Sequence, residues 1–382
     1  MTAAPPPLNW NRAATCGEPA PGVAEAMLEG LVAGTPGRGG DGDRAAERLR
    51  RARGRLARLL GFAHPERVVF GPGATFALNQ ALHGCVRPGQ RILTTRLEHN
   101  AVLRPLEVLR AAGCQVRQVP FAEDGRIDPS AWEEACGAFQ PHWAVIGLAS
   151  NVLGTIQPLP ELAAAARRAG ARVVADLAQG AGQIEVRCDD WGLDLAAVAG
   201  HKSLRGPRGV GALLVAPKLQ PRPLIQGGTG VLGHRREMPP ELPIALEAGT
   251  PNLPGIFGLE RALAWLEEHP PALGPVRRRL AALEEDLRAD PRWEVLPRRP
   301  VPWDRRLPVL SLLGRGFPVQ EAAAYLAQLG IHVRAGLQCA PDVCADLGAR
   351  RGVLRLSPPI EAGEEEFTRV RAALAETAEV LG

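Results

Sequence analysis

Short apolar runs alternate with alanine-rich helical stretches over the first part of the chain. Seven runs have the length and apolar content of strands, at residues 68–70, 91–95, 115–119, 144–149, 172–175, 193–198 and 210–215. Helical patterns lie between them, such as residues 159–169, which Gly170 ends. Strands that alternate with helices predict an α/β domain built on a mostly parallel, seven-stranded sheet.

The pattern changes after the last of these strands. Residues 217–254 are rich in Gly and Pro and have little periodicity, so they predict an irregular crossing segment. Beyond it, helical patterns at 256–268, 275–287, 319–329 and 364–380 mix with short strand patterns at 309–313, 331–333 and 353–356. We therefore expect an N-terminal arm (1–14) that packs with a small domain, a large domain (15–255) and a small α+β domain (256–382).

Length and charge exclude several classes of protein. A chain of 382 residues is long enough for two or three packed units. The net charge of +4 is small and no basic cluster is interleaved with aromatic residues, which argues against nucleic acid and favours a small-molecule substrate. We find neither a signal segment nor an apolar run of membrane length, so we expect a cytoplasmic protein with no membrane contact.

The cysteines give no sign of a disulfide framework. All seven are scattered along the chain, their number is odd, and none stands in a CxxC pair. This usage argues against disulfides and a zinc ribbon, and we predict no metal site. At most one or two of the thiols are expected to be functional.

Lysine is rare in this chain. Nearly all basic residues are arginine, and the two lysines are Lys202 and Lys218. A lysine amine can lose its proton and form a Schiff base with a carbonyl group, whereas an arginine stays protonated. Each lysine is therefore a candidate for chemistry, and the alternative is that both are ordinary surface residues.

Polar and small residues follow several predicted strands, where open α/β sheets bind their ligands. Gly73, Ala74 and Thr75 open a helix after the first strand, and the N–H groups of such a helix start can seat a phosphate. Residues that follow later strands are His99, Asn151, Asp176 and Gln179. Each also has a structural interpretation, because strand-end aspartates often cap helices and glycine is common in βα turns.

The pair His201-Lys202 indicates that these positions belong to one site. It follows the predicted strand 193–198, between Gly200 and the glycine-rich residues 206–211, which suits a tight loop that brings an amine to a cofactor. A phosphate seat, a Schiff-base lysine, a carboxylate for a pyridinium nitrogen and a histidine over a ring are the set that pyridoxal 5′-phosphate (PLP) requires.

At these residues the chain resembles the class V aminotransferase fold, and within it the cysteine desulfurase and selenocysteine lyase-like enzymes. The resemblance covers nearly the whole chain, from Ala13 to about Pro358, and implies the type I fold of PLP-dependent transferases. Its matching motifs are Pro36-Gly37-Arg38-Gly39-Gly40, Gly73-Ala74-Thr75, Glu98-His99-Asn100-Ala101-Val102, Ser150-Asn151-Val152-Leu153-Gly154-Thr155, Asp176 with Ala178-Gln179, Gly200-His201-Lys202, Gly227-Gly228-Thr229-Gly230, Gly249-Thr250, Arg334-Ala335-Gly336 with Cys339-Ala340, and Arg355-Leu356-Ser357.

The resemblance implies a role for each candidate residue. Lys202 would hold PLP as a Schiff base, His99 would stack on the ring, and Cys339 would be the nucleophile. The other cofactor contacts implied are Ala74, Thr75, Asn151, Asp176 (to the ring nitrogen), Gln179, His201 and, from the second subunit of a homodimer, Thr229. The substrate carboxylate would bind Arg355, with Asn151 beside it, through the bidentate pairing that arginine favours.

The implied reaction is that of the short-loop cysteine desulfurases. A small amino acid, L-cysteine, is the implied substrate, or selenocysteine in the selenium-abstracting relatives. The Cys339 thiolate would attack its sulfur, keep it as a persulfide and release alanine. An acceptor protein would then take the sulfur.

Several positions depart from the family pattern around the rim of the implied site. They are Arg12, Asp41, Phe76, Ala199, Gln338 and the stretch Pro358-Pro359-Ile360. These departures favour a specialised relative and leave two alternatives open. One is another PLP aminotransferase or C–S lyase in which Cys339 is a buried small hydrophobe. The other is a catalytically silent binding partner, against which the retained Lys202, Asp176, His99 and Arg355 argue.

Overall fold

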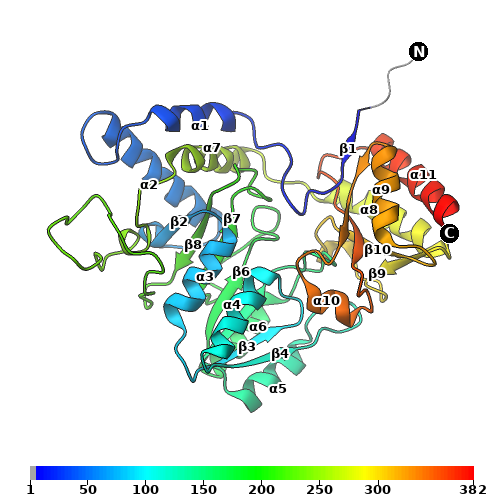
Figure 1. Ribbon diagram of the computed structural model, residues 1–382, viewed down its shortest axis with the longest axis horizontal. Coiled ribbons are helices and arrows are strands. Elements are labelled where there is room, and N and C mark those ends of the chain that lie inside the picture. Colours follow the sequence, from blue (N-terminus) through cyan, green and yellow to red (C-terminus); the bar gives the residue numbers. More distant parts are fainter. Residues whose placement is uncertain (1–5) are drawn as a thin grey trace.

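The computed structural model describes residues 6–382, and its large domain is built on a seven-stranded sheet (Figure 1). The strands are β2 (Val68–Gly71), β3 (Arg91–Thr95), β4 (Gln115–Val119), β5 (Trp143–Gly147), β6 (Arg172–Asp176), β7 (Leu195–Ala199) and β8 (Gly211–Val215). Their order is β2-β8-β7-β6-β5-β3-β4, with β8 antiparallel to both neighbours and the pairs from β7 to β4 parallel. The predicted mostly parallel sheet is confirmed.

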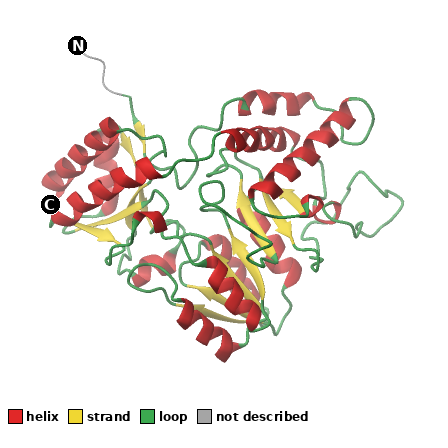
Figure 2. Ribbon diagram, turned by 180° about the vertical axis from the view of Figure 1, so that it is seen from behind, coloured by secondary structure: helices red, strands yellow, loops and turns green. Residues whose placement is uncertain are grey.

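Successive residues of each strand face two different cores. In β6, Val173 and Ala175 belong to one apolar cluster and Val174 to the other. Helices cover both faces of the sheet (Figure 2), so the central strands β5 to β8 are buried on both faces and almost wholly apolar, whereas the edge strand β4 exposes Gln115 and Arg117. These helices are α2 (Asp41–Leu59), α5 (Pro129–Phe139), α6 (Leu159–Arg168) and α7 (Leu253–Glu268) on one face, and α3 (Ala74–Cys85) and α4 (Asn100–Ala111) on the other.

Helix α7 spans the domain boundary that we expected between residues 255 and 256. It packs against α1 (Val23–Val32) and α2, and the three helices lie together at the upper left of Figure 1. Phe257 of α7 is buried with Ala26 and Ala45. Leu259 and Leu263 belong to the apolar cluster that also contains Val173 of β6. The apolar face of α7 thus packs on helices and strands of the expected large domain.

The small domain has a four-stranded antiparallel sheet covered by helices. Its sheet order is β12-β13-β10-β9, and its core is one apolar cluster. The elements are β9 (Trp293–Leu296), β10 (Leu310–Gly314), β12 (Arg334–Gly336) and β13 (Val353–Leu356), with α8 (Gly274–Ala289), α9 (Val319–Gln328), α10 (Pro341–Asp346) and α11 (Glu364–Leu381). Strands β9 and β12 were not among those expected.

The N-terminal segment pairs with the small domain. Strand β1 (Leu8–Asn9) lies parallel to β11 (Ile331–His332), and the buried Trp10 packs on Phe367 at a ring-centroid distance of 4.7 Å. Of the arm expected at residues 1–14, residues 1–5 lie outside the described part of the chain. Between residues 6 and 382, none of the helices is both long and apolar enough to cross a bilayer.

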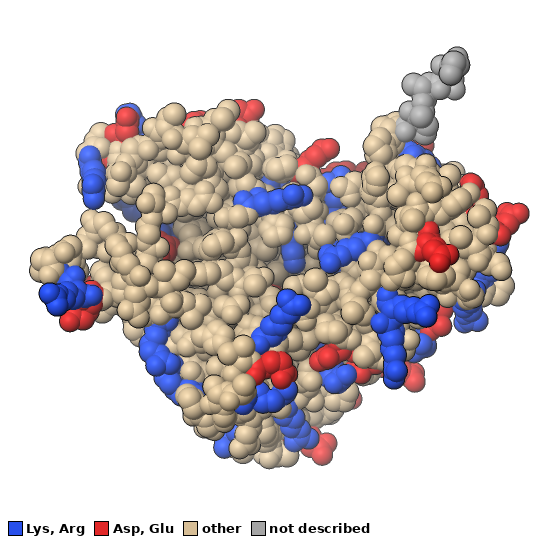
Figure 3. Space-filling view, in the orientation of Figure 1, with Lys and Arg blue, Asp and Glu red and all other residues tan. Residues whose placement is uncertain are grey.

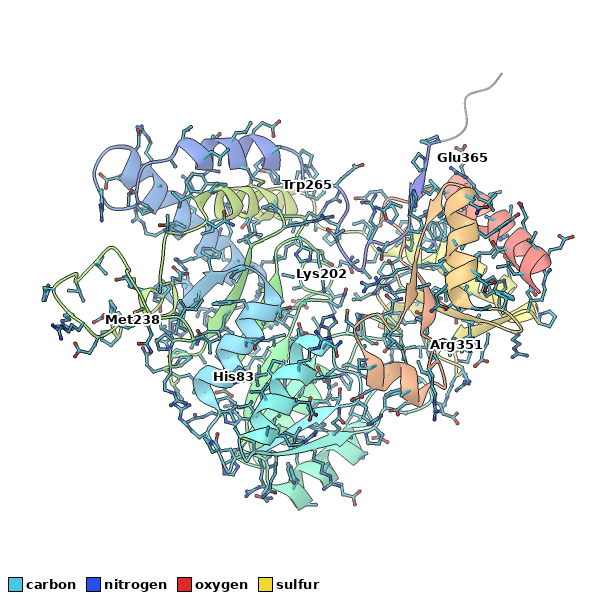
Figure 4. The ribbon with its side chains drawn as sticks, in the orientation of Figure 1. His83, Lys202, Met238, Trp265, Arg351 and Glu365 are labelled. Atoms are coloured by element: carbon cyan, nitrogen blue, oxygen red, sulfur yellow. The ribbon has the colours of Figure 1, made fainter. Side chains whose placement is uncertain are left out.

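The segment expected to be irregular has little regular structure. Between β8 and α7 it contains one short 3₁₀ turn, Ile244–Leu246. Part of it projects as an open loop on the left of Figure 4, where Met238 is labelled. This loop carries exposed apolar side chains, at Leu224, Ile225, Val231 and Leu232.

Candidate active site

A cavity of about 720 Å³ opens where several strands of the large sheet end, beside residues of the small domain. Lys202 lies at the centre of the molecule between the two domains (Figure 4), and basic side chains flank the hollow there (Figure 3). The predicted site residues that line this cavity are Ala74, Thr75, His99, Asn151, Gln179, His201, Lys202 and Arg355. The chain thus brings together residues that are up to 281 positions apart, Ala74 and Arg355.

Two smaller cavities adjoin this one and hold two further predicted residues. Asp176 lines a cavity of about 50 Å³ together with His99 and Lys202. Cys339 lines another of about 280 Å³, which also shares His99 and Thr75 with the main cavity. His99 therefore lies where all three cavities meet.

The start of α3 forms one end of the main cavity. No side chain caps this helix, so its first N–H groups are free to bind an anion, and Thr75 adds a hydroxyl group. Gly211 makes room for the turn, because a Cβ atom there would lie 2.7 Å from the Cα of Gly73. The residues at this end can hold a phosphate group.

The turn after β7 carries His201 and Lys202 into the same cavity. The main-chain oxygen of His201 accepts hydrogen bonds from the Cys16 N–H (2.9 Å) and the Thr15 hydroxyl (3.1 Å), which hold the turn in place. Nδ1 of His201 is buried and has no hydrogen-bond partner among the described residues. An uncompensated buried nitrogen beside an uncapped helix start is a further sign of an anion site.

Lys202 is in an environment that favours its neutral amine. Burial lowers its pKa, and the carboxylate of Asp176 opposes this effect only in part. The guanidinium groups of Arg334 and Arg355 add to the lowering. A neutral amine is the form that attacks a carbonyl or accepts a proton.

Asp176 ends β6 with its carboxylate facing the small cavity. Its Oδ1 accepts a 2.9 Å hydrogen bond from the Ala178 N–H, which fixes the side chain. Gln179, one turn later, donates 2.8 Å from Nε2 to the Ala13 main-chain oxygen and so joins the N-terminal segment to the site.

His99 has a structural role in addition to its place in the site. It is the N-cap of α4, with Nδ1 accepting a 3.0 Å hydrogen bond from the Ala101 N–H. This bond requires an unprotonated Nδ1, and burial lowers the pKa of His99, so both favour a neutral ring with its proton on Nε2. The cap fixes the plane of the ring.

Arg355 is a buried cation without a carboxylate partner among residues 6–382. Its Nη1 donates to the Asn151 main-chain oxygen and its Nη2 to the Asn11 side chain, both at 2.9 Å, while Nε has no partner in the described chain. Burial and the neighbouring Arg334 lower the pKa of Arg355 to about 9, so it is still charged at neutral pH. Such a group can bind a carboxylate.

Cys339 lies in a tight loop between β12 and α10. Gln338 and Cys339 both have left-handed backbone angles, with φ of 53° and 56°. The amide of Asn151 donates 2.7 Å to the Gln338 main-chain oxygen, and the Asn100 N–H donates 2.7 Å to that of Cys339. These bonds join the loop to the large domain.

Thr229 does not reach the cavity of its own chain. It lies in the projecting loop, where its hydroxyl donates 3.1 Å to the Val231 main-chain oxygen. Its predicted role requires a second subunit.

Among the lining residues that were not predicted as site residues are Arg334, Gln338 and Glu98. Arg334 lines the main cavity, and Gln338, also in its wall, donates from Nε2 to the main-chain oxygens of Arg334, Gly336 and Val353. Glu98 is buried in the small cavity with Asp176. Each stands within or next to a motif quoted above, but its residue type alone does not show whether it faces a ligand.

Comparisons with known proteins agree with this arrangement. The family model for class V aminotransferases matches residues 12–370. A cysteine desulfurase of Bradyrhizobium diazoefficiens is 36% identical over 64% of this chain and 59% of that protein, so this match spans less than two thirds of the relative. A cysteine desulfurase of Cereibacter sphaeroides is 33% identical over 93% of this chain and 86% of that protein.

A solved structure extends the similarity to three dimensions. The apo cysteine desulfurase of Thermococcus onnurineus superposes with a TM-score of 0.87 at 26% identity, over 98% of this chain and 95% of that one. The family model covers the main cavity, the Lys202 turn and the Cys339 loop. This chain therefore belongs to the class V aminotransferase family, in its cysteine desulfurase branch.

Proposed function

We propose that this protein is a PLP-dependent cysteine desulfurase that takes sulfur from L-cysteine onto Cys339 and releases alanine. One observation carries the proposal. The amine of Lys202, the carboxylate of Asp176 and the ring of His99 line one small cavity, and Cys339 lines another that also contacts His99. The relatives named above support the same reaction.

The residues of the main cavity fit PLP. The uncapped start of α3, the Thr75 hydroxyl and the unpartnered Nδ1 of His201 would bind its phosphate. Asp176 would pair with the ring nitrogen and Lys202 would bond covalently to the aldehyde carbon. Asn151 and Gln179 would contact the oxygen side of the ring, with Ala74 at the phosphate end.

PLP, when bound, withdraws electrons from the substrate Cα and so makes its proton acidic. The depressed pKa of Lys202 makes its neutral amine available to accept that proton. His99, held by its helix-capping bond, would keep the ring of the cofactor in one plane. Asp176 would stabilise positive charge on the ring nitrogen.

The substrate would be bound at both ends. Arg355 would hold its carboxylate, because the guanidinium is buried, charged and without a carboxylate partner in the described chain. The Cys339 sulfur would attack the substrate sulfur, so that an S–S bond forms as the C–S bond breaks. A proton delivered to the carbon then gives alanine.

Three further features belong to the same proposal. We infer a homodimer, in which Thr229 completes the phosphate site of the neighbouring subunit, because the projecting loop exposes apolar side chains that a partner would cover. A sulfur-acceptor protein would take the persulfide sulfur from Cys339. The seven free cysteines fit a reducing compartment, and we place the enzyme in the cytoplasm.

One observation favours an alternative on the same fold. Cys339 lines the neighbouring cavity and not the main one, as would be expected if the reaction did not need its thiol. A PLP-dependent C–S lyase would use the same Lys202, Asp176 and Arg355 and would produce pyruvate and sulfide instead of alanine.

Product analysis separates these reactions. Purified protein is incubated with PLP and cysteine, and alanine, pyruvate and sulfide are measured separately. We expect alanine, and we expect sulfide as excess substrate thiol or an added thiol reduces the persulfide. Pyruvate in place of alanine would identify a lyase, and the absence of all three products would overturn both readings.

A further inference from the structure

Glu98 is a buried carboxyl group to which the proposed reaction assigns no role. It lies between β3 and α4 with 2% of its surface exposed. Both hydrogen bonds that it accepts go to Oε1, from the Thr95 hydroxyl at 2.7 Å and the Gly147 N–H at 3.2 Å. No residue between 6 and 382 donates a hydrogen bond to its second oxygen, Oε2.

The geometry brings this carboxyl group to Asp176. Gly147 of β5 stands directly beside Asp176 of β6 in the parallel register, and a Cβ on Gly147 would lie 3.4 Å from Oε2 of Glu98. Both carboxyl groups line the same cavity of about 50 Å³. The other titratable groups in that cavity are His99 at the start of α4 and Lys202 in the turn after β7.

Electrostatics decides whether the fold accommodates Glu98 as an ionised carboxylate or as a neutral, protonated carboxyl group. Two ionised carboxylates in one buried cavity repel each other and both lose hydration. Asp176 already faces Lys202, whereas Glu98 has no cationic partner in the part of the chain described. Burial raises the pKa of Glu98 to about 8, and the Asp176 carboxylate adds to this effect.

We propose that Glu98 is a positioning residue whose protonated carboxyl group shares its hydrogen with Asp176, so that the pair carries one negative charge. The inference rests on the proposed function, because a single negative charge matches the single positive charge of a protonated pyridine nitrogen. Glu98 would keep the Asp176 carboxylate oriented toward that nitrogen. It would also prevent a second negative charge from accumulating in the cavity at neutral pH.

The first test detects the proton itself. Infrared spectra of the full-length protein with bound PLP, recorded at pH 6.5 and 9.5, should contain a protonated-carboxyl band that disappears at the higher pH. Glu98→Gln should lack this band at both pH values. Glu260→Gln is the control, since Glu260 is also buried but paired with Arg48 and Arg55, both at 3.1 Å, and should leave the band in place.

The second test asks whether the proton acts on the cofactor site. The absorbance of the bound cofactor should show an additional titration step near pH 8 in the wild type that Glu98→Gln lacks. The glutamine side chain has nearly the same shape as a protonated glutamate and can also donate a hydrogen bond. The PLP dissociation constant of Glu98→Gln should therefore stay within about threefold of the wild-type value. Glu98→Ala, which keeps neither, should bind PLP at least tenfold more weakly.

The outcomes distinguish this inference from the proposed function. A wild-type band that Glu98→Gln leaves unchanged, or a titration step that survives in Glu98→Gln, would overturn the role of Glu98. Failure of the wild type to bind PLP would overturn the proposed function, while the infrared band of the full-length protein would still decide the protonation of Glu98. Loss of PLP from Glu98→Gln to the same extent as from Glu98→Ala would also refute the inference.

Discussion

The guanidinium of Arg334 reaches the sulfur of Cys339, with Nη2 3.6 Å from Sγ. Arg334 has no carboxylate partner among the described residues, so its positive charge is available to the sulfur and to the adjoining cavity. In the hydrogen bonds formed within residues 6–382, Cys339 is the cysteine whose sulfur accepts from a guanidinium group.

Cys339→Ala should separate cofactor binding from sulfur transfer. We expect the variant to bind PLP with unchanged affinity, because Cys339 does not line the main cavity. Alanine release should fall by about 10³-fold or more, the scale on which loss of a covalent nucleophile acts. Alanine formed at the wild-type rate would contradict the role of Cys339.

Cys344→Ala is the matched control. Cys344 lies five residues further on, is fully buried in α10, and burial raises the pKa of its thiol to about 11. We expect wild-type alanine release from this variant. Iodoacetamide labelling followed by peptide mapping should modify Cys339 in the native protein and leave Cys344 unmodified.

Lys202→Ala should abolish the covalent bond to the cofactor. Borohydride reduction of the wild type should fix a pyridoxyl group on Lys202, and the variant should lack it and lose activity below detection. Lys218→Ala is the control, since Lys218 lies outside all three cavities. A pyridoxyl group found on Lys218 would contradict the assignment of the site.

The sequence was sufficient to predict most of the large sheet because its central strands are buried on both faces. Consecutive residues such as Val173 and Val174 are both apolar, because each faces one of the two cores. Glycine-containing turns or helices separate the strands. Strand β12 was missed because its three residues begin with Arg334 and form one edge of the small sheet, where neither burial nor alternation marks them. The boundary at α7 depends on tertiary packing of Phe257, which periodicity alone does not reveal.

That the candidate residues lie near one another could be predicted from the sequence, but their contacts could not. Lys202, Asp176 and Arg355 stand at strand ends or in motifs, and their convergence follows from the topology. The capping bond of His99 and the partnerless Oε2 of Glu98 depend on side-chain geometry that no local pattern encodes. Glu98 in particular looks like an ordinary polar residue until its burial is known.

Arg355→Lys should impair substrate binding more than cofactor binding. A lysine cannot donate both to Asn151 and Asn11 and still offer paired N–H groups to a carboxylate. We expect kcat/KM for cysteine to fall by about 10²-fold or more, with PLP retained. Arg351→Lys, on the exposed surface of the small domain, should match the wild type, and an equal loss in both variants would exclude a specific role for Arg355.

Thr229→Ala tests the second subunit. Because Thr229 lies far from the cavity of its own chain, its loss should weaken PLP retention only if a partner supplies it. We expect a dimer in light scattering, an unchanged unfolding midpoint and PLP dissociation accelerated by about tenfold, the effect of one hydrogen bond to a charged group. A monomer that holds PLP tightly would contradict this assembly.

Glu98 should also make the stability of the protein depend on pH. Its pKa is raised from 4.5 to about 8 in the folded state, so its favourable contribution is complete below pH 4.5 and is lost as the pH rises through 8. Relative to Glu98→Gln, the wild type should lose about 1.4 kcal/mol of unfolding free energy per pH unit within this window. Urea unfolding of both proteins without cofactor at pH 6 and pH 8 measures the difference, and parallel curves would contradict it.

The side chain of Gln338 joins the two groups that would meet opposite ends of the substrate. It is the residue before Cys339, and its Nε2 bonds to the main-chain oxygen of Val353, two residues before Arg355 on β13. The same Nε2 also donates to the main-chain oxygens of Arg334 and Gly336 on β12. A displacement of β13 that moved Arg355 would therefore also displace the loop that carries Cys339.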